Sequence, residues 1–390
     1  MAEHDGMRNL LLLICIALCA GYFLVGFSPF RPRVANNLGW RHGMDGTYFG
    51  WLSSVYSERE LDLIGSPSSA SEDGAISVEL LLSSGHRQTG VVGTILALYD
   101  GHLPPNLLIA QWKSELLLRV PVRNADGRRI RREVGAGLDL RRGIRRFIAV
   151  TSGPGGTRFY IDGELSKAYP RLIPQPETLR GRLVVGDAPE GNSHWSGELA
   201  GMAVFNRSLD AREVGRHFEL WTNKKWRDIA AEPGLAALYN LGERSGRTIP
   251  DRSVSGNPLI APEYYRRFRK TVLVPPWRDP HRYFSDTGDV SLNILGFIPL
   301  GFFYFFYRSR IRPGRTWHNL GLAALLSGTI SLVIELIQVY LPTRSSTLTD
   351  VICNTAGGLA GAFLAALARP LLGPRASAET ANRGHAPPGD

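Results

Sequence analysis

The chain has 390 residues, 44% of them hydrophobic and 21% charged, a composition that excludes a wholly disordered protein. Its formal net charge of +10 is unevenly spread. Residues 40–225 carry 24 Lys and Arg against 21 Asp and Glu, which argues against a nucleic-acid-binding surface as the source of the charge. Cys15, Cys19 and Cys353 all lie in apolar runs, so a disulfide framework is excluded for the region between them.

Residues 1–8 precede an apolar run at 9–28, which predicts a first transmembrane helix. The run is uncharged after Arg8 and is about as long as a bilayer requires. A cleaved signal peptide is the alternative, but bulky Tyr22, Phe23 and Phe27 stand where a small-residue cleavage site is needed. We therefore expect a retained anchor.

Residues 40–260 predict an all-β domain. Short apolar runs such as Ile76–Leu82 recur along it, separated by the tight-turn dipeptides Asp100-Gly101, Asp126-Gly127 and Asp162-Gly163. Short strands at this density are typical of an antiparallel sandwich or jelly roll. One helix is expected at 209–221, where Asp210 and Glu213 have the spacing of a capping box.

Three segments of this domain resemble the laminin-G-like (LamG), concanavalin A-like jelly-roll family. RFYIDGEL at 158–165 is similar to the family's Asp-Gly hairpin, and GELAGMAVFNRSLDAREV at 197–214 is similar to its closing segment. GLAALYNLGERSGRTIPDRSVSGN at 234–257 resembles the opening strand of the family, although here it follows the closing segment. The resemblance implies a sandwich that recognises glycans or envelope proteins or binds no ligand at all, with calcium as the one cofactor considered.

Single side chains of the sandwich leave alternatives open. Trp195, like Trp112 and Trp221, can stack on a sugar ring, but a tryptophan in a sandwich is more often a core residue. Asp162 can help to bind calcium, or it can serve only as a turn residue. His194 has no second His or Cys nearby in the sequence, so no metal site is expected.

A basic cluster follows the turn at Asp126-Gly127. It is either a solvated loop face or a contact for anionic lipid head groups or a cell-wall polymer. The cluster consists of Arg128, Arg129, Arg131, Arg132, Arg141, Arg142, Arg145 and Arg146. Residues 261–289, with Trp277 and several tyrosines and arginines, are expected to form an outer juxtamembrane linker.

Residues 290–369 predict a helical bundle with spans at about 290–307, 319–341 and 350–368. Together with the first helix this makes four spans, which place both termini on one side. Arginines cluster after the second and fourth spans, and such clusters mark the cytoplasmic side: Arg308, Arg310, Arg312, Arg315, Arg369, Arg375 and Arg383. We expect a multi-pass protein of a bacterial inner membrane, with a disordered cytoplasmic tail at 370–390 and residues 40–260 exported.

Six polar residues come from three of these spans and from one outer turn. They are Asn293, Glu335, Gln338, Arg344, Asp350 and Asn354. Because polar groups are costly in lipid, their convergence on the outer leaflet indicates a ligand site. The alternative is that Glu335 pairs with Arg344 and the asparagines only join helices. Pro299 is expected to kink its span, and Gly296, Gly301, Gly357 and Gly361 are expected to allow close helix packing.

The same segments resemble the VanZ-like family. The resemblance rests on NILGFIPLGFF at 293–303, on SLVIELIQVYLPTRSSTLTDVICNTAGGLAG at 331–361, and on the anchor that runs into Ser28-Pro29-Phe30. The matching positions are Asn293, Pro299, Gly301, Glu335, Gln338, Pro342, Arg344, Asp350, Asn354 and Gly357. The turn Ser-Ser-Thr-Leu-Thr replaces a more acidic stretch, so the charge of the site differs. The sandwich is then an insertion between the first two spans.

The namesake of that family is associated with low-level resistance to the glycopeptide teicoplanin. The leading hypothesis is a protein that binds or processes an amphiphilic envelope component, such as a membrane lipid or a lipid-linked cell-wall precursor, at the outer leaflet. A proton-coupled transporter or membrane enzyme that uses Glu335 is the alternative, although the bundle has no nucleophile–base pair, no His/Cys metal set and no phosphate loop. A third hypothesis is a membrane-anchored lectin or adhesin. No nucleic-acid partner is expected, and neither catalytic residues nor an oligomeric state can be assigned.

Overall fold

The computed structural model describes residues 2–28, 30–39, 45–64, 74–85, 92–124, 126–191, 193–242, 246–277 and 287–372. Pro29, linker residues 278–286 and the tail beyond residue 372, all subjects of predictions above, lie outside the described residues. The chain divides into two compact units. The bundle unit is Met1–Phe30, Val272–Gln338 and Ser346–Asp390, and the sandwich unit is Arg31–Thr271 and Val339–Ser345.

The sandwich unit contains two antiparallel sheets, so the predicted mixed fold class is confirmed. The first sheet has, in spatial order, β1 (Leu38–Gly39), β2 (Thr47–Phe49), β14 (Gly197–Phe205), β5 (Ile76–Ser84), β10 (Arg145–Gly153), β11 (Gly156–Ile161) and β12 (Glu164–Tyr169), with β15 (Leu235–Asn240) paired to β14. The second has β16 (Thr248–Ile249), β17 (Leu259–Ile260), β3 (Val55–Ser57), β13 (Arg180–Val185), β6 (Gly93–Tyr99), β7 (Leu107–Trp112), β8 (Glu115–Arg123) and β9 (Arg129–Asp139), with β4 (Leu61–Asp62) paired to β13.

The main core fills the space between the two sheets. Both faces of strand β5 are buried. Ile76, Val78, Leu80 and Leu82 point into this core, because alternate residues of a strand share a face. The intervening residues of β5 face the other way. The segment after the closing strand contributes β15 to the first sheet and β16 and β17 to the second, so both sheets need it.

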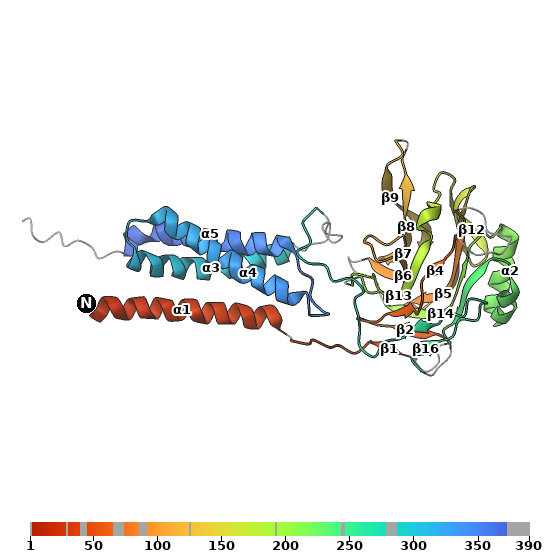
Figure 1. Ribbon diagram of the computed structural model, residues 1–390, viewed down its shortest axis with the longest axis horizontal. Coiled ribbons are helices and arrows are strands. Elements are labelled where there is room, and N and C mark those ends of the chain that lie inside the picture. The colour runs from red at the N-terminus through yellow and green to blue at the C-terminus, as the bar shows by residue number, and fades with distance from the viewer. Residues whose placement is uncertain are drawn as a thin grey trace, which may run out of the picture. The chain divides into compact units, whose positions relative to one another are not determined.

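Helix α2 (Ala211–Thr222) covers the outer face of the first sheet and makes a second core (Figure 1). The predicted capping box is present: Asp210 Oδ1 accepts hydrogen bonds from the N–H groups of Arg212 and Glu213, at 2.8 and 2.9 Å, and Glu213 accepts one from the N–H of Asp210 at 2.9 Å. Trp221 packs over β14 at Gly201, where an added Cβ would lie 2.1 Å from its ring. The 3-10 helices are Pro176–Thr178 and Trp226–Ala231.

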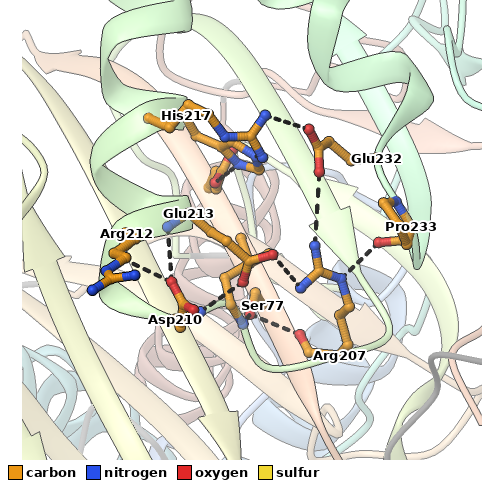
Figure 2. A network of polar contacts seen from close by, with 11 residues as sticks. Ser77, Arg207, Asp210, Arg212, Glu213, His217, Glu232 and Pro233 are labelled. Carbon is orange, nitrogen blue, oxygen red and sulfur yellow. Dashed lines mark hydrogen bonds and ion pairs between the residues drawn. The ribbon is translucent and has the colours of Figure 1, made fainter.

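Ion pairs fasten the start and middle of α2 to the sheet, as Figure 2 shows. Arg207, which follows β14, places Nη1 2.8 Å from Glu213 Oε1, and its Nε donates to the carbonyl of Pro233 at 2.7 Å. Arg216 donates to Glu232 at 2.6 Å. These contacts join α2 to the segment after β14 and to the segment before β15, so they hold the first half of α2 in place.

The bundle unit contains α1 (Ala2–Phe27), α3 (Thr287–Ile311), α4 (Thr316–Gln338) and α5 (Leu348–Leu372). Within the described residues these four helices are long and apolar enough to cross a membrane. Helices α3, α4 and α5 pack side by side, and α1 lies along α3 and α4 (Figure 1). The ring of Tyr22 on α1 stacks on Phe297 of α3 with centroids 4.4 Å apart. Many outward leucines are exposed, as a lipid-facing surface requires.

Candidate functional site

Four helix ends meet at one end of the bundle. Gln338, at the end of α4, donates from Nε2 to the carbonyl of Gly26 near the end of α1, at 2.8 Å. Asn293, in α3, donates from Nδ2 to Asp350 Oδ1 in the first turn of α5, at 2.7 Å. The opposite end carries arginines from four helix termini: Arg8, Arg308, Arg310, Arg315 and Arg369. The amide and acidic groups are thus separated from the basic ones by the length of the helices.

Glu335 is buried, with 4% of its surface exposed, one turn before the end of α4. Its Oε2 accepts a hydrogen bond from the backbone N–H of Thr347, at 2.9 Å. Thr347 immediately precedes α5, and its Oγ1 accepts from the N–H of Asp350 at 3.2 Å, as a helix N-cap does. Two carboxylates therefore lie at the N-terminus of α5, where the helix dipole favours negative charge.

A second polar layer lies one turn deeper. Asn354 of α5 is buried and donates from Nδ2 to Ser331 Oγ of α4, at 2.8 Å. Within the described residues, Asn354 Oδ1 has no hydrogen-bond partner, and Ser327 Oγ, one turn along α4, has none either. Two buried acceptor atoms thus face the α4–α5 interface unsatisfied, and buried polar atoms of this kind commonly hold water or a ligand group.

Three glycines allow α3 and α5 to meet backbone to backbone. An added Cβ would lie 1.8 Å from the carbonyl oxygen of Gly358 at Gly301, 2.1 Å from that of Ile294 at Gly357, and 2.0 Å from that of Ile298 at Gly361. Gly296 differs, because nothing lies within 4 Å of the position its Cβ would take, so close packing does not require a glycine there. Pro299 lies inside α3, between these contact points.

An extended segment fastens the turn before α5, and sequence reasoning missed it. Val274 donates from its N–H to the carbonyl of Ser346 at 3.0 Å and accepts from the N–H of Leu348 at 3.0 Å. The N–H of Leu273 donates to Ser346 Oγ at 3.1 Å. This short parallel bridge lies next to the Glu335–Thr347 hydrogen bond, so it holds the donor to Glu335 in place. The short run Thr-Val-Leu-Val at 271–274, in which three of four residues are β-branched, is a local signal for an extended segment there.

Arg344 and Pro342 belong to the segment Val339–Ser345, which is part of the sandwich unit. Arg267 of the same unit donates from Nη1 to the carbonyl of Arg344, at 2.7 Å. Five of the six predicted polar residues therefore lie in the bundle unit, in contacts that join its helices and the turn before α5. The convergence of all six on one site stays a prediction.

The two predicted sandwich contacts take different positions. Trp195 is fully buried between the sheets and donates from Nε1 to Gln111 Oε1, at 2.9 Å. Its ring has no exposed face, which excludes stacking on a sugar and leaves the core alternative. Asp162 and Gly163 form the two-residue turn between β11 and β12, both with positive φ, of 50° and 86°. Asp162 also accepts from the N–H of Phe147 at 3.0 Å and pairs with Arg146.

Asp162 lines a cavity of about 610 Å³ between α2 and the first sheet. The charged groups of this cavity compensate one another: Asp45 lies 3.2 Å from both Arg145 and Lys224. Lys224, followed by Arg145, holds the pKa of the Asp45 carboxyl below its ordinary value. Aromatic walls come from Phe147, Phe218, Trp221 and Trp226.

A buried carboxylate lies beneath this cavity. Glu79, on the outer face of β5, has no exposed surface. Its Oε1 lies 2.6 Å from Nδ1 of His217, and its Oε2 accepts from Nε1 of Trp221 at 3.0 Å. No local pattern in the sequence pairs Trp221 with a glutamate more than a hundred residues away.

A further polar cluster surrounds Asp187. His194 Nδ1 lies 2.8 Å from Asp187 Oδ2, and the hydroxyl of Tyr265 donates to the same oxygen. Burial, together with the neighbouring Asp187, raises the pKa of Tyr265 above its ordinary value. In the described part of the chain, no group of three or more His, Cys, Asp or Glu side chains is placed to hold a metal ion.

Family models match two parts of the chain. Residues 249–369 match the family model described as VanZ/LLP1, and residues 110–215 match that of the Concanavalin A-like lectin/glucanases superfamily. The resemblances drawn from the sequence are thus confirmed. No curated protein matches the chain.

Solved structures match part of the chain at low identity. A Bacteroides ovatus protein, to which carbohydrate binding is provisionally ascribed, is 13% identical with a TM-score of 0.37 and covers 54% of this chain. This chain spans 58% of that protein. A heptameric SAP-like pentraxin from Limulus polyphemus is 14% identical with a TM-score of 0.34, covering 48% of this chain and 80% of its own. A Trypanosoma rangeli sialidase is 12% identical with a TM-score of 0.31, covering 38% and 23%.

Proposed function

We propose that this membrane protein, which combines a VanZ-like bundle with a concanavalin A-like sandwich, binds the polar head of an amphiphilic envelope component at the outer-leaflet end of its bundle. The membrane is the inner membrane of a bacterium, with both termini in the cytoplasm and the sandwich exported. A link to glycopeptide resistance of the teicoplanin type is part of the proposal.

The observation that carries the proposal is the separation of polar groups along the bundle. Asn293, Glu335, Gln338 and Asp350 lie at one end, and most of the arginines lie at the other. Because arginine-rich ends remain in the cytoplasm, the end with Glu335 and Asp350 is assigned to the outer leaflet. Polar side chains inside a membrane are costly and are usually retained for function.

The charges at that end narrow the class of head group. Glu335 and Asp350 contribute two carboxylates, and Asn354 contributes a buried acceptor atom. Such a site suits a head group rich in donors, namely hydroxyl and amine groups, better than one rich in phosphate.

The sandwich is proposed as the recognition domain for glycan or envelope protein. The support is the superfamily match, because concanavalin A-like domains include lectins. A fold shared by many functions does not define a ligand. The sandwich therefore needs a test of its own, separate from that of the bundle.

The bundle site is tested with Glu335→Gln and Asp350→Asn in the full chain, reconstituted in nanodiscs. Each substituted amide keeps an oxygen that accepts a hydrogen bond, so the new side chain at position 335 can still bond Thr347 while the charge is lost. We expect binding of fluorescent teicoplanin to weaken by about tenfold in each variant. The matched control is Asp289→Asn, an exposed carboxylate in the first turn of α3.

Unchanged teicoplanin binding in both variants, at normal insertion, contradicts a head-group site at these carboxylates. Binding lost equally in the Asp289 control points to a nonspecific charge effect.

The burial of Glu335 favours a second candidate, a proton-coupled transporter. In that case Glu335→Gln abolishes pH-driven uptake into proteoliposomes while Asp350→Asn retains it.

A further inference from the structure

The structure divides the arginine cluster of residues 128–146 among different surroundings. Arg145 pairs with Asp45 and Glu198, at 3.2 and 2.9 Å, and Arg146 pairs with Asp162 at 2.5 Å. These two arginines are committed to contacts within the sandwich. A ligand must therefore be met by other members of the cluster.

Arg132 lies on the inner face of the second sheet. In the β8–β9 ladder it stands opposite Val120, a residue of the main core with 1% of its surface exposed, and opposed residues point to the same face. Its neighbour Arg131 stands opposite Pro121 and points to the other face. An arginine on an inner face is unusual, and it marks the place where the core ends and the two sheets open.

At this opening lies a cavity of about 510 Å³. Its floor and walls are apolar, with Ile130, Val134, Tyr169 and Leu172 among them, and its charged residues are Arg123, Arg132 and Arg171. No acidic side chain lines it among the described residues. Next to the cavity, two hydrogen bonds join β12 of the first sheet to β9 of the second. Ser166 Oγ donates to the carbonyl of Ala136 at 2.9 Å, and Tyr169 Oη donates to that of Gly135 at 2.7 Å.

The three arginines differ in how they are paired. Arg123 lies 2.9 Å from Glu177, just outside the lining. Arg132 and Arg171 are exposed and have no ion-pair or hydrogen-bond partner in the described part of the chain. The cavity under α2 is the opposite case, since its two acidic and two basic residues balance. Of these two cavities, the opening at Arg132 is the one with a net positive charge.

We infer that this cavity binds an anionic sugar of an envelope glycan, a saccharide unit that carries a carboxylate or a phosphate. Arg132 and Arg171 would bind the anionic group, since a guanidinium matches the geometry of both groups. The ring of the sugar would lie on the apolar wall at Tyr169. A volume of about 510 Å³ is within the range of small-molecule sites. The inference rests on the recognition role proposed for the sandwich, and it is independent of the bundle's ligand.

The test uses the full chain in nanodiscs of phosphatidylcholine, with binding measured by calorimetry. The probes are a galacturonate oligosaccharide, a sugar phosphate and a neutral glucose oligosaccharide. We expect both anionic probes to bind better than the neutral one, by about tenfold, and to bind more weakly in high salt. The stronger of the two anionic probes then identifies carboxylate or phosphate as the natural group.

Two variants sharpen this test in opposite directions. The double variant Arg132→Gln/Arg171→Gln should lose about tenfold or more in affinity for the anionic probes, and the matched control Arg128→Gln, an exposed arginine of the same hairpin outside the lining, should lose little. Glu177→Gln should gain affinity, because it releases Arg123 from its internal partner. If the double variant folds poorly, the affinity gain expected for Glu177→Gln still tests the inference.

Equal binding of neutral and anionic probes, or no binding of any probe, overturns the inference. So does binding only to vesicles that contain anionic lipid, which would make the arginines a membrane contact. Glu335→Gln should leave this binding unchanged. A failure of the sandwich site and a failure of the bundle site are therefore distinguishable.

Discussion

The bundle and the sandwich each bury a glutamate, and they hold it in different ways. In the sandwich, both oxygens of Glu79 meet side chains of a single helix, His217 and Trp221 of α2. In the bundle, Glu335 meets the backbone of Thr347 at the start of another helix. Gln338 and Asn293 likewise reach to other helices.

This difference indicates which part of the fold each polar group stabilises. Glu79 fixes one helix against one sheet, so its loss should be felt locally. The bundle's polar groups join one helix to another helix or to the turn before α5, and each has its hydrogen-bond partner there. Such contacts are individually weak, because the unfolded chain in a membrane also finds partners. Close backbone packing, and not polar contacts, should therefore dominate the bundle's stability.

The largest expected effect is that of Gly361→Leu. A side chain there would overlap the carbonyl oxygen of Ile298, 2.0 Å from the new Cβ, so α3 and α5 must separate. We expect a loss of more than about 4 kcal/mol, measured as loss of monodisperse protein in detergent. Gly321→Leu in α4 is the control, since nothing lies within 4 Å of its Cβ position. A normal yield of the Gly361 variant would disprove the dominance of backbone packing.

Glu79→Ala should have the next largest effect. It leaves His217 and Trp221 without their buried acceptor, and breaking a buried hydrogen-bonded pair costs about 3–5 kcal/mol. Hydrogen exchange in the full chain should accelerate over α2 and leave the four bundle helices unchanged. Glu164→Ala, an exposed residue of β12, provides the baseline. Faster exchange throughout the sandwich would show that Glu79 supports more than α2.

Asn354→Ala is expected to cost only about 1 kcal/mol, as interhelical amide bonds typically do. It removes the contact to Ser331 together with an unsatisfied buried oxygen, and these two effects partly cancel. Thermal stability in detergent, compared with Leu359→Ala on the exposed side of α5, measures it. A cost as large as that of Glu79→Ala would remove the contrast between the two units.

The smallest effect is a pH dependence at Glu232. Arg216, with smaller contributions from His217 and Arg207, holds the pKa of Glu232 below its ordinary value of 4.5. A lowered pKa in the folded state means that the stabilisation is present above pH 4.5 and is lost as the pH falls through the folded value. At pH 7 the free energy of unfolding of the wild type should exceed that of Glu232→Gln by less than about 1 kcal/mol, because Arg216 is half exposed.

At a pH below the lowered pKa of Glu232 the two curves should meet, since Glu232 is then protonated in both states. Urea unfolding followed across about pH 3 to 7 measures this difference. Curves that stay parallel over the whole range would show that Glu232 acts through packing instead of charge. The result thus distinguishes an electrostatic contribution of Glu232 from a packing contribution in the contacts that hold α2.

Local patterns in the sequence were enough to predict the main elements. Long apolar runs predicted the four bundle helices, and Asp210 with Glu213 predicted the cap of α2, because these signals are local in the sequence. The Asp162-Gly163 turn followed from the conformational freedom of its two residues.

The contacts between distant residues could not be predicted in this way. No local signal joins Val274 to Thr347, or Glu79 to His217, because each pair is made by folding alone. Arg132 was indistinguishable from its neighbours until the β8–β9 register placed it on the inner face. The polar residues of the bundle were identified as a group, but their partners were not.

Helix α1 is synthesised long before the helices that it contacts. About 260 residues separate the end of α1 from the start of α3, and at ~5–20 residues per second a ribosome needs roughly 10–50 seconds to synthesise them. During that interval α1 stands in the membrane without its neighbours. Beyond Arg8 it carries no charged residue, so it can wait in lipid at little cost. The contact of Gln338 with Gly26 then joins the first helix made to the second-last, late in assembly.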